Sequence, residues 1–178
     1  NITSDKVYKN TESLEPFNES SELGGLDPYS CSKSCAELIS HAFFDTYVNK
    51  LKLSKLSIAN LRAGNVIGGG DFGANRIIPD IYRSAKMGEV LQLRMPYAIR
   101  PWQHVLDCLF GYLCALRHIS KSEDSISVNF NVGPQDSNSL TVLDICEQAK
   151  KWFPTLSLKT NLELVAESKF LLLDSKLL

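Results

Sequence analysis

The stretch Asp27-Pro28-Tyr29-Ser30-Cys31-Ser32-Lys33 decides how this sequence of 178 residues is interpreted. It follows a polar segment, residues 9–27, which contains proline and a Gly-Gly pair. Pro28 suits the first position of a helix, because its missing N–H would have no partner there. The pattern therefore predicts a loop over 9–27 and a helix from 28 to about 51, with Tyr29 and Lys33 one turn apart on the same face.

The Tyr29–Lys33 pair is suited to proton transfer. A lysine ammonium beside a phenol favours the phenolate, and the partial positive charge of the helix N-terminus acts in the same sense. A phenol that loses its proton near neutral pH can serve as a general base. The spacing alone is weak evidence, since Tyr82 and Lys86 repeat it after Pro79. That second copy is interpreted as an ordinary pair on a helix surface.

Further motifs surround this pair and give it weight. Thr3-Ser4-Asp5-Lys6 precedes it, whereas residues 61–71 (LRAGNVIGGGD) and 99–105 (IRPWQHV) follow it. Taken in this order, the motifs resemble the extended short-chain dehydrogenase/reductase family, which includes the NAD-dependent epimerases and dehydratases, over nearly the whole chain. AGNVIGGGDF and RPWQHV point to the branch that dehydrates CDP-glucose. In the branch that acts on dTDP-glucose, Thr-Asp-Glu is expected in place of Ser4-Asp5-Lys6.

The order of elements predicts a parallel sheet. Residues 56–62 are apolar and short, as a buried strand is, and strand–helix–strand order implies a right-handed crossover. The resemblance implies an α/β fold made of the C-terminal half of a Rossmann-type parallel sheet plus a small substrate-binding lobe. Residues 1–68 would form the second half of the NAD-binding domain and 102–132 its return helix and strand. Segments 69–101 and 133–178 would belong to the lobe, the second of them incomplete.

The remaining patterns predict shorter elements. Helices are expected over 77–88, 104–118 and 141–153, strands over 129–132, and a strand pair over 90–93 and 97–100 across a turn at Pro96. The apolar stripe of the first helix is made of Ala36, Leu38, Ile39, Ala42, Phe43, Tyr47 and Leu51. The glycine cluster 64–73 does not reproduce the G-x-G-x-x-G spacing, so a turn that reaches toward a substrate is favoured.

Composition excludes several classes of function. A net charge of −1 and a pI of about 6.3 give no attraction to nucleic acid or to anionic membranes, and no apolar run approaches a membrane span. Five irregularly spaced cysteines suit a reducing, cytoplasmic location. No metal is expected: His104 and His118 would lie roughly 21 Å apart on one helix, and Cys31 and Cys35 lack further ligands nearby.

The resemblance implies a role for each residue of two motifs. Tyr29 would be the base at the C4 hydroxyl of the glucose unit, and Lys33 would hold the nicotinamide ribose of NAD. Ser4 would hydrogen-bond the sugar O4, and Asp5 would protonate the departing C6 hydroxyl. Lys6 either takes the C5 proton or is an ordinary solvated loop lysine.

The resemblance also implies residues that bind the substrate, CDP-glucose. Asn65 and Arg100 would contact its diphosphate, for which a guanidinium is a two-pronged donor. Arg76 and Asn131 are further candidates, with a charge at a helix start and a turn-capping amide as the respective alternatives. The implied reaction oxidises C4, removes water across C5 and C6, and returns the hydride to C6. A homodimer through the Tyr-Lys helix is implied as well.

The glycine-rich turn that such a family uses for the NAD pyrophosphate is not among these residues, so the chain is expected to be truncated at both ends and impaired in turnover. Three functions therefore stay open. The chain is a piece of a CDP-glucose dehydratase or of a related epimerase or dehydratase. Otherwise it is a sugar-nucleotide binding module without chemistry, or an interaction module whose half-sheet pairs with a second chain.

Overall fold

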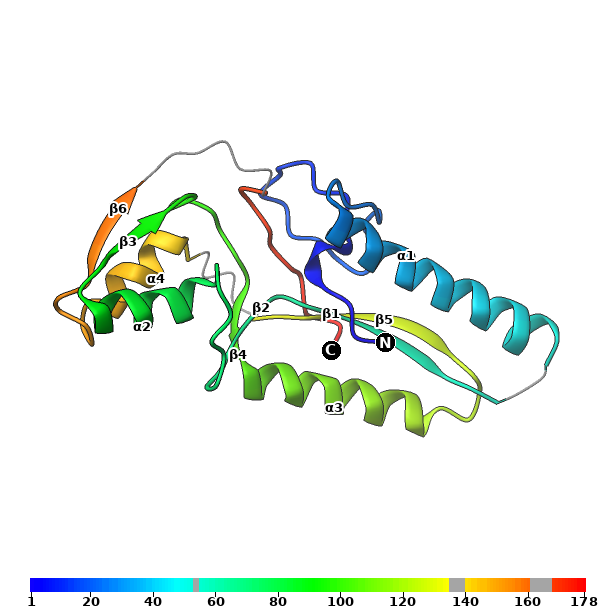
Figure 1. The fold of residues 1–178 in the computed structure, drawn as a ribbon. Helices are drawn as coiled ribbons and strands as arrows, with labels where there is room; N and C mark the ends of the chain where they lie inside the picture. The colour runs from blue at the N-terminus through cyan, green and yellow to red at the C-terminus, as the bar shows by residue number, and fades with distance from the viewer. Residues whose placement is uncertain (53–54, 135–139, 161–167) are drawn as a thin grey trace.

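A computed structural model describes residues 1–52, 55–134, 140–160 and 168–178 (Figure 1). It is an α/β structure with parallel strands, as predicted. Strand β1 (Ile58–Ala63) pairs in parallel with β5 (Ser127–Val132), and Leu61 lies opposite Phe130. On the other side of β1, Ile2 bridges Leu61 in the parallel sense. Residues 1–3 therefore extend the sheet next to β1, and the turn Asp5–Val7 follows shortly after them.

Two long helices cover opposite faces of this sheet (Figure 1). Helix α1 (Pro28–Phe43) begins at the predicted residue and continues as a π-helical segment, Phe44–Lys50. Helix α3 (Val105–Lys121) lies on the other face. A Cβ atom on its Gly111 would lie 2.8 Å from Cγ1 of Val132, so a glycine is needed where α3 approaches the sheet.

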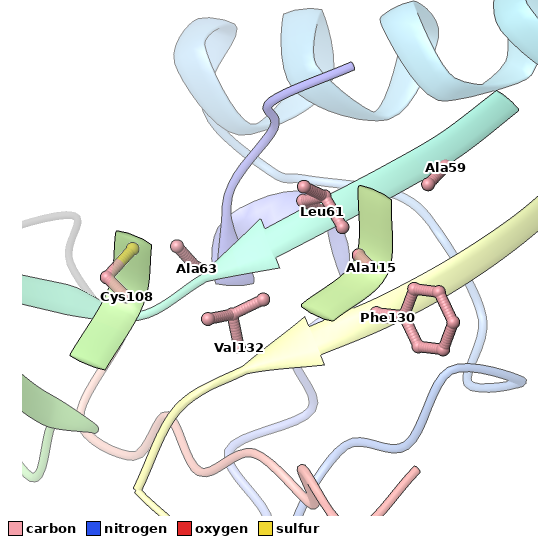
Figure 2. Close-up of a cluster of buried hydrophobic side chains, with 7 residues drawn as sticks. All are labelled: Ala59, Leu61, Ala63, Cys108, Ala115, Phe130 and Val132. Carbon is pink, nitrogen blue, oxygen red and sulfur yellow. The ribbon is translucent and has the colours of Figure 1, made fainter. Parts of the chain in front are cut away.

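The apolar core lies between the sheet and α3. Alternate residues of a strand point to opposite faces, so Ala59, Leu61 and Ala63 of β1 share one face. They pack with four other buried side chains, as Figure 2 shows: Cys108, Ala115, Phe130 and Val132. This core fixes β1, and with it the position of the residues that follow β1 in the chain.

The face of the sheet toward α1 is polar. Asn60 and Arg62 of β1 are buried, and α1 buries Ser30, Ser34 and Glu37. The apolar stripe of the same helix points to solvent, with Leu38, Ile39 and Phe43 exposed by 56%, 69% and 47%. Helix α1 is thus held to the sheet by hydrogen bonds and charge, and its apolar side is uncovered in this chain.

A smaller layer is built from the second part of the chain. Helix α2 (Ile77–Met87), strand β3 (Val90–Leu93), helix α4 (Val142–Ala149) and strand β6 (Ser157–Thr160) surround a second apolar cluster. Thr141 caps α4 as predicted, within a capping box. Strands β3 and β6 pair in parallel.

The predicted pairing of 90–93 with 97–100 is wrong. After the turn at Pro96 the chain leaves β3, and Ile99 bridges Thr141 and Phe170. The Ile99 N–H donates to the Lys169 carbonyl at 2.9 Å. The backbone of Ile99 is therefore paired with residues that lie far away in the sequence.

A short parallel pair joins the two layers, and the sequence did not predict it. Strand β2 (Asn65–Ile67) follows β1, and β4 (Trp102–His104) precedes α3. Within the described residues, no helix is long and apolar enough to cross a membrane.

Candidate active site

A cavity of about 740 Å³ lies where the two layers meet. One part of its wall comes from residues 4–6 and Tyr29, and most of the rest from β2, α2, β3 and the segments that precede α2 and β4. All but two of the predicted site residues line it: Ser4, Asp5, Lys6, Tyr29, Asn65, Arg76 and Arg100. Motifs that are far apart in the sequence therefore meet at one cavity.

Asp5 is a buried carboxyl in this wall. It begins the 3₁₀ turn Asp5–Val7, whose cap is Ser4; the Ser4 hydroxyl accepts from the Lys6 N–H at 3.2 Å and donates to Asp5 Oδ1 at 2.9 Å. Among the described residues, Asp5 Oδ2 has no hydrogen-bond partner. Burial raises the pKa of Asp5 to about 6, opposed by the Ser4 hydrogen bond and by the charges of Lys6 and Arg100. Asp5 can therefore hold a proton close to neutral pH.

Tyr29 lies close to two amines. Its side chain is 52% exposed, and the Nζ atoms of Lys33 and Lys6 lie 5.8 and 5.9 Å from the ring centroid. The ring is placed by the start of α1, where Asp27 Oδ1 accepts from the Ser30 N–H at 3.0 Å.

Lys33 and Asn131 do not line the cavity. Lys33 stays adjacent to the Tyr29 ring on α1, as its spacing predicts. Asn131 is fully buried in β5. Its amide donates to the carbonyls of Phe17 at 2.8 Å and Asp174 at 2.9 Å, and accepts from the Tyr8 hydroxyl at 2.5 Å. The Asn131 side chain therefore joins backbone segments outside this cavity, and the structure does not bring it together with the predicted site residues that line the cavity.

The three predicted phosphate ligands differ in their surroundings. Arg100 is 7% exposed and donates to the carbonyls of Ile99, Ser168 and Lys169 at 2.7 to 3.3 Å. The Arg76 side chain is 67% exposed and pairs with Asp71 at 3.0 Å. Asn65 is half-buried at the start of β2. Arg76 is thus an exposed guanidinium that a phosphate can reach, whereas Arg100 also holds the backbone around the cavity.

The glycine segment contributes to the wall through close packing. Gly64 and Gly68 both line the cavity. A Cβ atom at Gly68 would lie 2.8 Å from Val105 Cγ1, so this glycine lets the turn pass close to α3.

Gln92 and Arg94 also line the cavity and were not predicted. The alternation of β3 could have identified them. Leu91 and Leu93 enter the core, so the side chains of residues 92 and 94 point to the other face of the strand.

Residues 1–133 match the model of the NAD dependent epimerase/dehydratase family. The chain belongs to this family. It is 44% identical over 144 residues to the CDP-glucose 4,6-dehydratase of Salmonella typhimurium, an alignment that covers 80% of this chain and 40% of that enzyme.

Solved structures share the fold of this family member. A UDP-glucuronic acid 4-epimerase from Bacillus cereus, in complex with UDP-glucuronic acid and NAD, superposes with a TM-score of 0.82 at 18% identity, covering 99% of this chain and 52% of that one. A dTDP-glucose 4,6-dehydratase from Bacillus anthracis in complex with NAD gives 0.73 at 21% identity over 99% and 52%. The chain thus spans about half of these solved chains, and less of the curated relative.

The cavity of this epimerase/dehydratase family member presents an acid and a phenol together. Asp5 provides a buried, protonatable carboxyl, and Tyr29 a phenol beside two amines. Among the residues that the structure describes, no three His, Cys, Asp or Glu side chains are grouped as a metal ion requires. The chemistry available from these side chains is proton transfer.

Proposed function

We propose that this chain carries the acid–base part of a CDP-glucose 4,6-dehydratase, which converts CDP-glucose to CDP-4-keto-6-deoxyglucose. The observation that carries the proposal is the meeting of Asp5 and Tyr29 at one cavity that also contains Asn65 and Arg76. The 44% identity to a CDP-glucose 4,6-dehydratase supports this substrate over other sugar nucleotides. Lys6 agrees with it, as the residue that sets the CDP-glucose branch apart.

The proposed cofactor is NAD, and the residues next to Tyr29 fit it. The ring is 52% exposed and Lys33 is half-buried beside it, so a ribose hydroxyl can approach both side chains. Bound NAD supplies the hydride chemistry, accepting a hydride from C4 of the sugar and returning it to C6. Lys33 is assigned to hold the ribose.

The proton transfers are assigned to side chains of the cavity wall. Tyr29 takes the proton of the C4 hydroxyl as C4 becomes a ketone, while Ser4 holds O4. The ketone makes the C5 proton acidic, and Lys6 in its neutral form removes this proton and returns it to C5 as the hydride enters C6. Asp5 then gives its proton to the C6 hydroxyl, which leaves as water. The raised pKa of Asp5, about 6, suits this last step, because the carboxyl can carry the proton that the leaving group needs.

Phosphate binding is assigned to Asn65 and Arg76, with Arg100 holding the wall behind them. The Arg76 guanidinium is exposed and forms an ion pair with Asp71, and a diphosphate can take the place of that carboxylate. Arg100 adds positive charge near Asp5. An anionic substrate is therefore met by guanidinium groups at the same cavity as the acid and the phenol.

The test measures binding and turnover separately. The purified chain is titrated with CDP-glucose, UDP-glucose and CDP by calorimetry, and is then incubated with CDP-glucose and NAD while mass spectrometry follows loss of one water. We expect tighter binding of CDP-glucose than of UDP-glucose, and any dehydrated product to disappear with Asp5→Asn and with Tyr29→Phe. Binding without product would favour a sugar-nucleotide binding module. Absence of both binding and product would contradict the proposal.

We also propose that the exposed stripe of α1, defined by Leu38, Ile39 and Phe43, is covered by a second copy of the chain. Their exposure of 56%, 69% and 47% is unusual for three neighbouring large apolar side chains. Sedimentation should detect a dimer that Ile39→Glu dissociates. Met87→Glu, at an equally exposed position on α2, is the matched control. A monomer at all concentrations would contradict this proposal.

A further inference from the structure

A buried ion pair joins β1 to α1. The Arg62 side chain is 1% exposed and that of Glu37 is fully buried. Arg62 Nε donates to both carboxylate oxygens of Glu37, at 2.9 and 3.1 Å, and Nη2 donates to Oε2 at 2.5 Å. The free-energy cost of removing two charges from water offsets much of their mutual attraction. A buried ion pair is therefore weak evidence for stability by itself. Its partners suggest a second role.

Both members of this pair reach toward the N-terminal segment. The Thr3 hydroxyl donates to Glu37 Oε1 at 2.5 Å. Arg62 Nη1 donates to the Tyr8 hydroxyl at 2.9 Å. Thr3 and Tyr8 are the residues directly before and after residues 4–7. One ion pair therefore fixes both ends of the short segment that carries Ser4, Asp5 and Lys6.

The same helix also contacts the middle of this arrangement. The Ser34 hydroxyl donates to the Val7 carbonyl at 2.7 Å, and α1 carries Tyr29 at its start. Glu37 lies eight residues after Tyr29 in the same helix, a rise of about 12 Å along its axis. A shift of the N-terminal segment against α1 would change the position of Asp5 relative to Tyr29.

We propose that Arg62 and Glu37 are positioning residues that hold Asp5 in its buried place in the wall of the cavity that Tyr29 also lines, through one arm at Thr3 and one at Tyr8. The roles of Asp5 as acid and Tyr29 as base rest on the proposed function, whereas the positioning of Asp5 does not. Neither Arg62 nor Glu37 lines the cavity, so they act through the two arms.

The test removes one arm at a time and leaves the ion pair in place. Thr3→Val deletes the hydroxyl that reaches Glu37, and Tyr8→Phe deletes the one that contacts Arg62. The readout is the titration of the Asp5 carboxyl by carbon NMR in the whole chain without ligand. The groups that face Asp5 are Ser4, Lys6 and Arg100, and none of them is altered.

If the proposal is right, water reaches Asp5 in each variant, and its pKa falls from about 6 toward 3.8, by about one pH unit or more. Thr3→Ser keeps the hydroxyl and should keep the pKa. Glu22→Gln is the matched control, because it disrupts the exposed Lys9–Glu22 pair in the same N-terminal region.

An unchanged Asp5 pKa in the folded variants would overturn the proposal. If one of the two variants fails to fold, the other still tests whether the Arg62–Glu37 pair holds Asp5 in place, because it removes the other contact to the pair. If neither folds, amide exchange in the unaltered chain decides: Lys6 and Val7 amides that exchange much faster than those of β1 would overturn it. The titration needs no substrate, so it stands if CDP-glucose does not bind. Where turnover is measurable, Thr3→Val should lower kcat about 10-fold with little change in KM.

Discussion

Gly64 packs against Pro101 so closely that a Cβ atom on Gly64 would lie 2.6 Å from Cγ and 2.7 Å from the carbonyl oxygen of Pro101. The same carbonyl accepts from the Asn65 N–H at 3.1 Å. The Gly64 N–H donates to the Val132 carbonyl at 3.2 Å. This contact therefore holds β1, β5 and the β2–β4 pair together at the edge of the cavity.

Gly64→Ala should destabilise the chain and weaken ligand binding. The new methyl group must push Pro101 away, and overpacking of this kind costs about 1–3 kcal/mol in the free energy of unfolding. Urea denaturation measures that cost, and calorimetry with CDP-glucose measures the binding. Gly69→Ala is the matched control, because a Cβ there would meet nothing within 4 Å. Equal stability of the two variants would contradict the prediction.

Asp5→Asn should stabilise the chain at neutral pH. The pKa of Asp5 is raised from 3.8 to about 6 in the folded chain, so the folded state binds this proton more tightly than the unfolded state. The resulting stabilisation is complete below about pH 4 and is lost as the pH rises through about 6. Asparagine carries no charge to desolvate, so the gain at pH 7.5 should be on the order of 3 kcal/mol.

Urea denaturation at pH 4 and pH 7.5 checks this prediction. The difference in the free energy of unfolding between Asp5→Asn and the unaltered chain should be small at pH 4 and large at pH 7.5. Glu123→Gln, which changes an exposed carboxyl after α3, should show no such difference. A gain of equal size at both pH values would contradict the assigned cause, which is burial of the charged form.

Glu37→Ala should be among the most damaging substitutions in the chain. It leaves the Arg62 guanidinium buried without its carboxylate, and breaking a buried pair in this way costs about 3–5 kcal/mol. Glu22→Ala breaks an exposed pair with Lys9 and should cost less than about 1 kcal/mol. Thermal or urea unfolding of both variants provides the comparison, and similar costs would show that Arg62 finds another partner.

Arg76→Ala should weaken CDP-glucose binding without unfolding the chain. The side chain is 67% exposed and lines the cavity, so its loss removes a charge for the diphosphate and little packing. We expect a loss of affinity of about 10-fold, as for one charge-assisted contact. Arg117→Ala on the exposed part of α3 is the control for net charge. Equal affinity in both variants would remove Arg76 from the binding site.

The starts of helices could be predicted from the sequence, because capping residues lie within one turn of the helix that they cap. Asp27 and Pro28 mark the start of α1, and Thr141 marks the start of α4. Strands β2 and β4 escaped prediction since each has only three residues and pairs with a segment far away in the sequence. Their sequence carries little periodicity, and the partner supplies the reason for the strand.

The same limit applied to the candidate site. The family resemblance assigned residues 4–6, Tyr29 and Asn65 to one site, and the structure places them at one cavity, because strand ends and the helix start converge there. Asn131 also lies near a strand end, but its amide is used by Phe17, Asp174 and Tyr8. The sequence around a polar residue at a strand end is the same whether its side chain faces a substrate or a neighbouring loop. Only tertiary contacts distinguish these two cases.

The contacts of Phe17 also constrain the order in which this region can form during synthesis. Phe17 bridges Leu173, and the Asp174 N–H donates to the Phe17 carbonyl at 2.9 Å. A ribosome exposes residue 17 long before residue 174, so the loop that follows Asp5 must wait, incompletely paired, for almost all of this chain to emerge. Until then its apolar and amide groups are open to proteases and chaperones. The acid of the cavity thus lies close in the sequence to a loop that is paired only after Leu173 and Asp174 have been made.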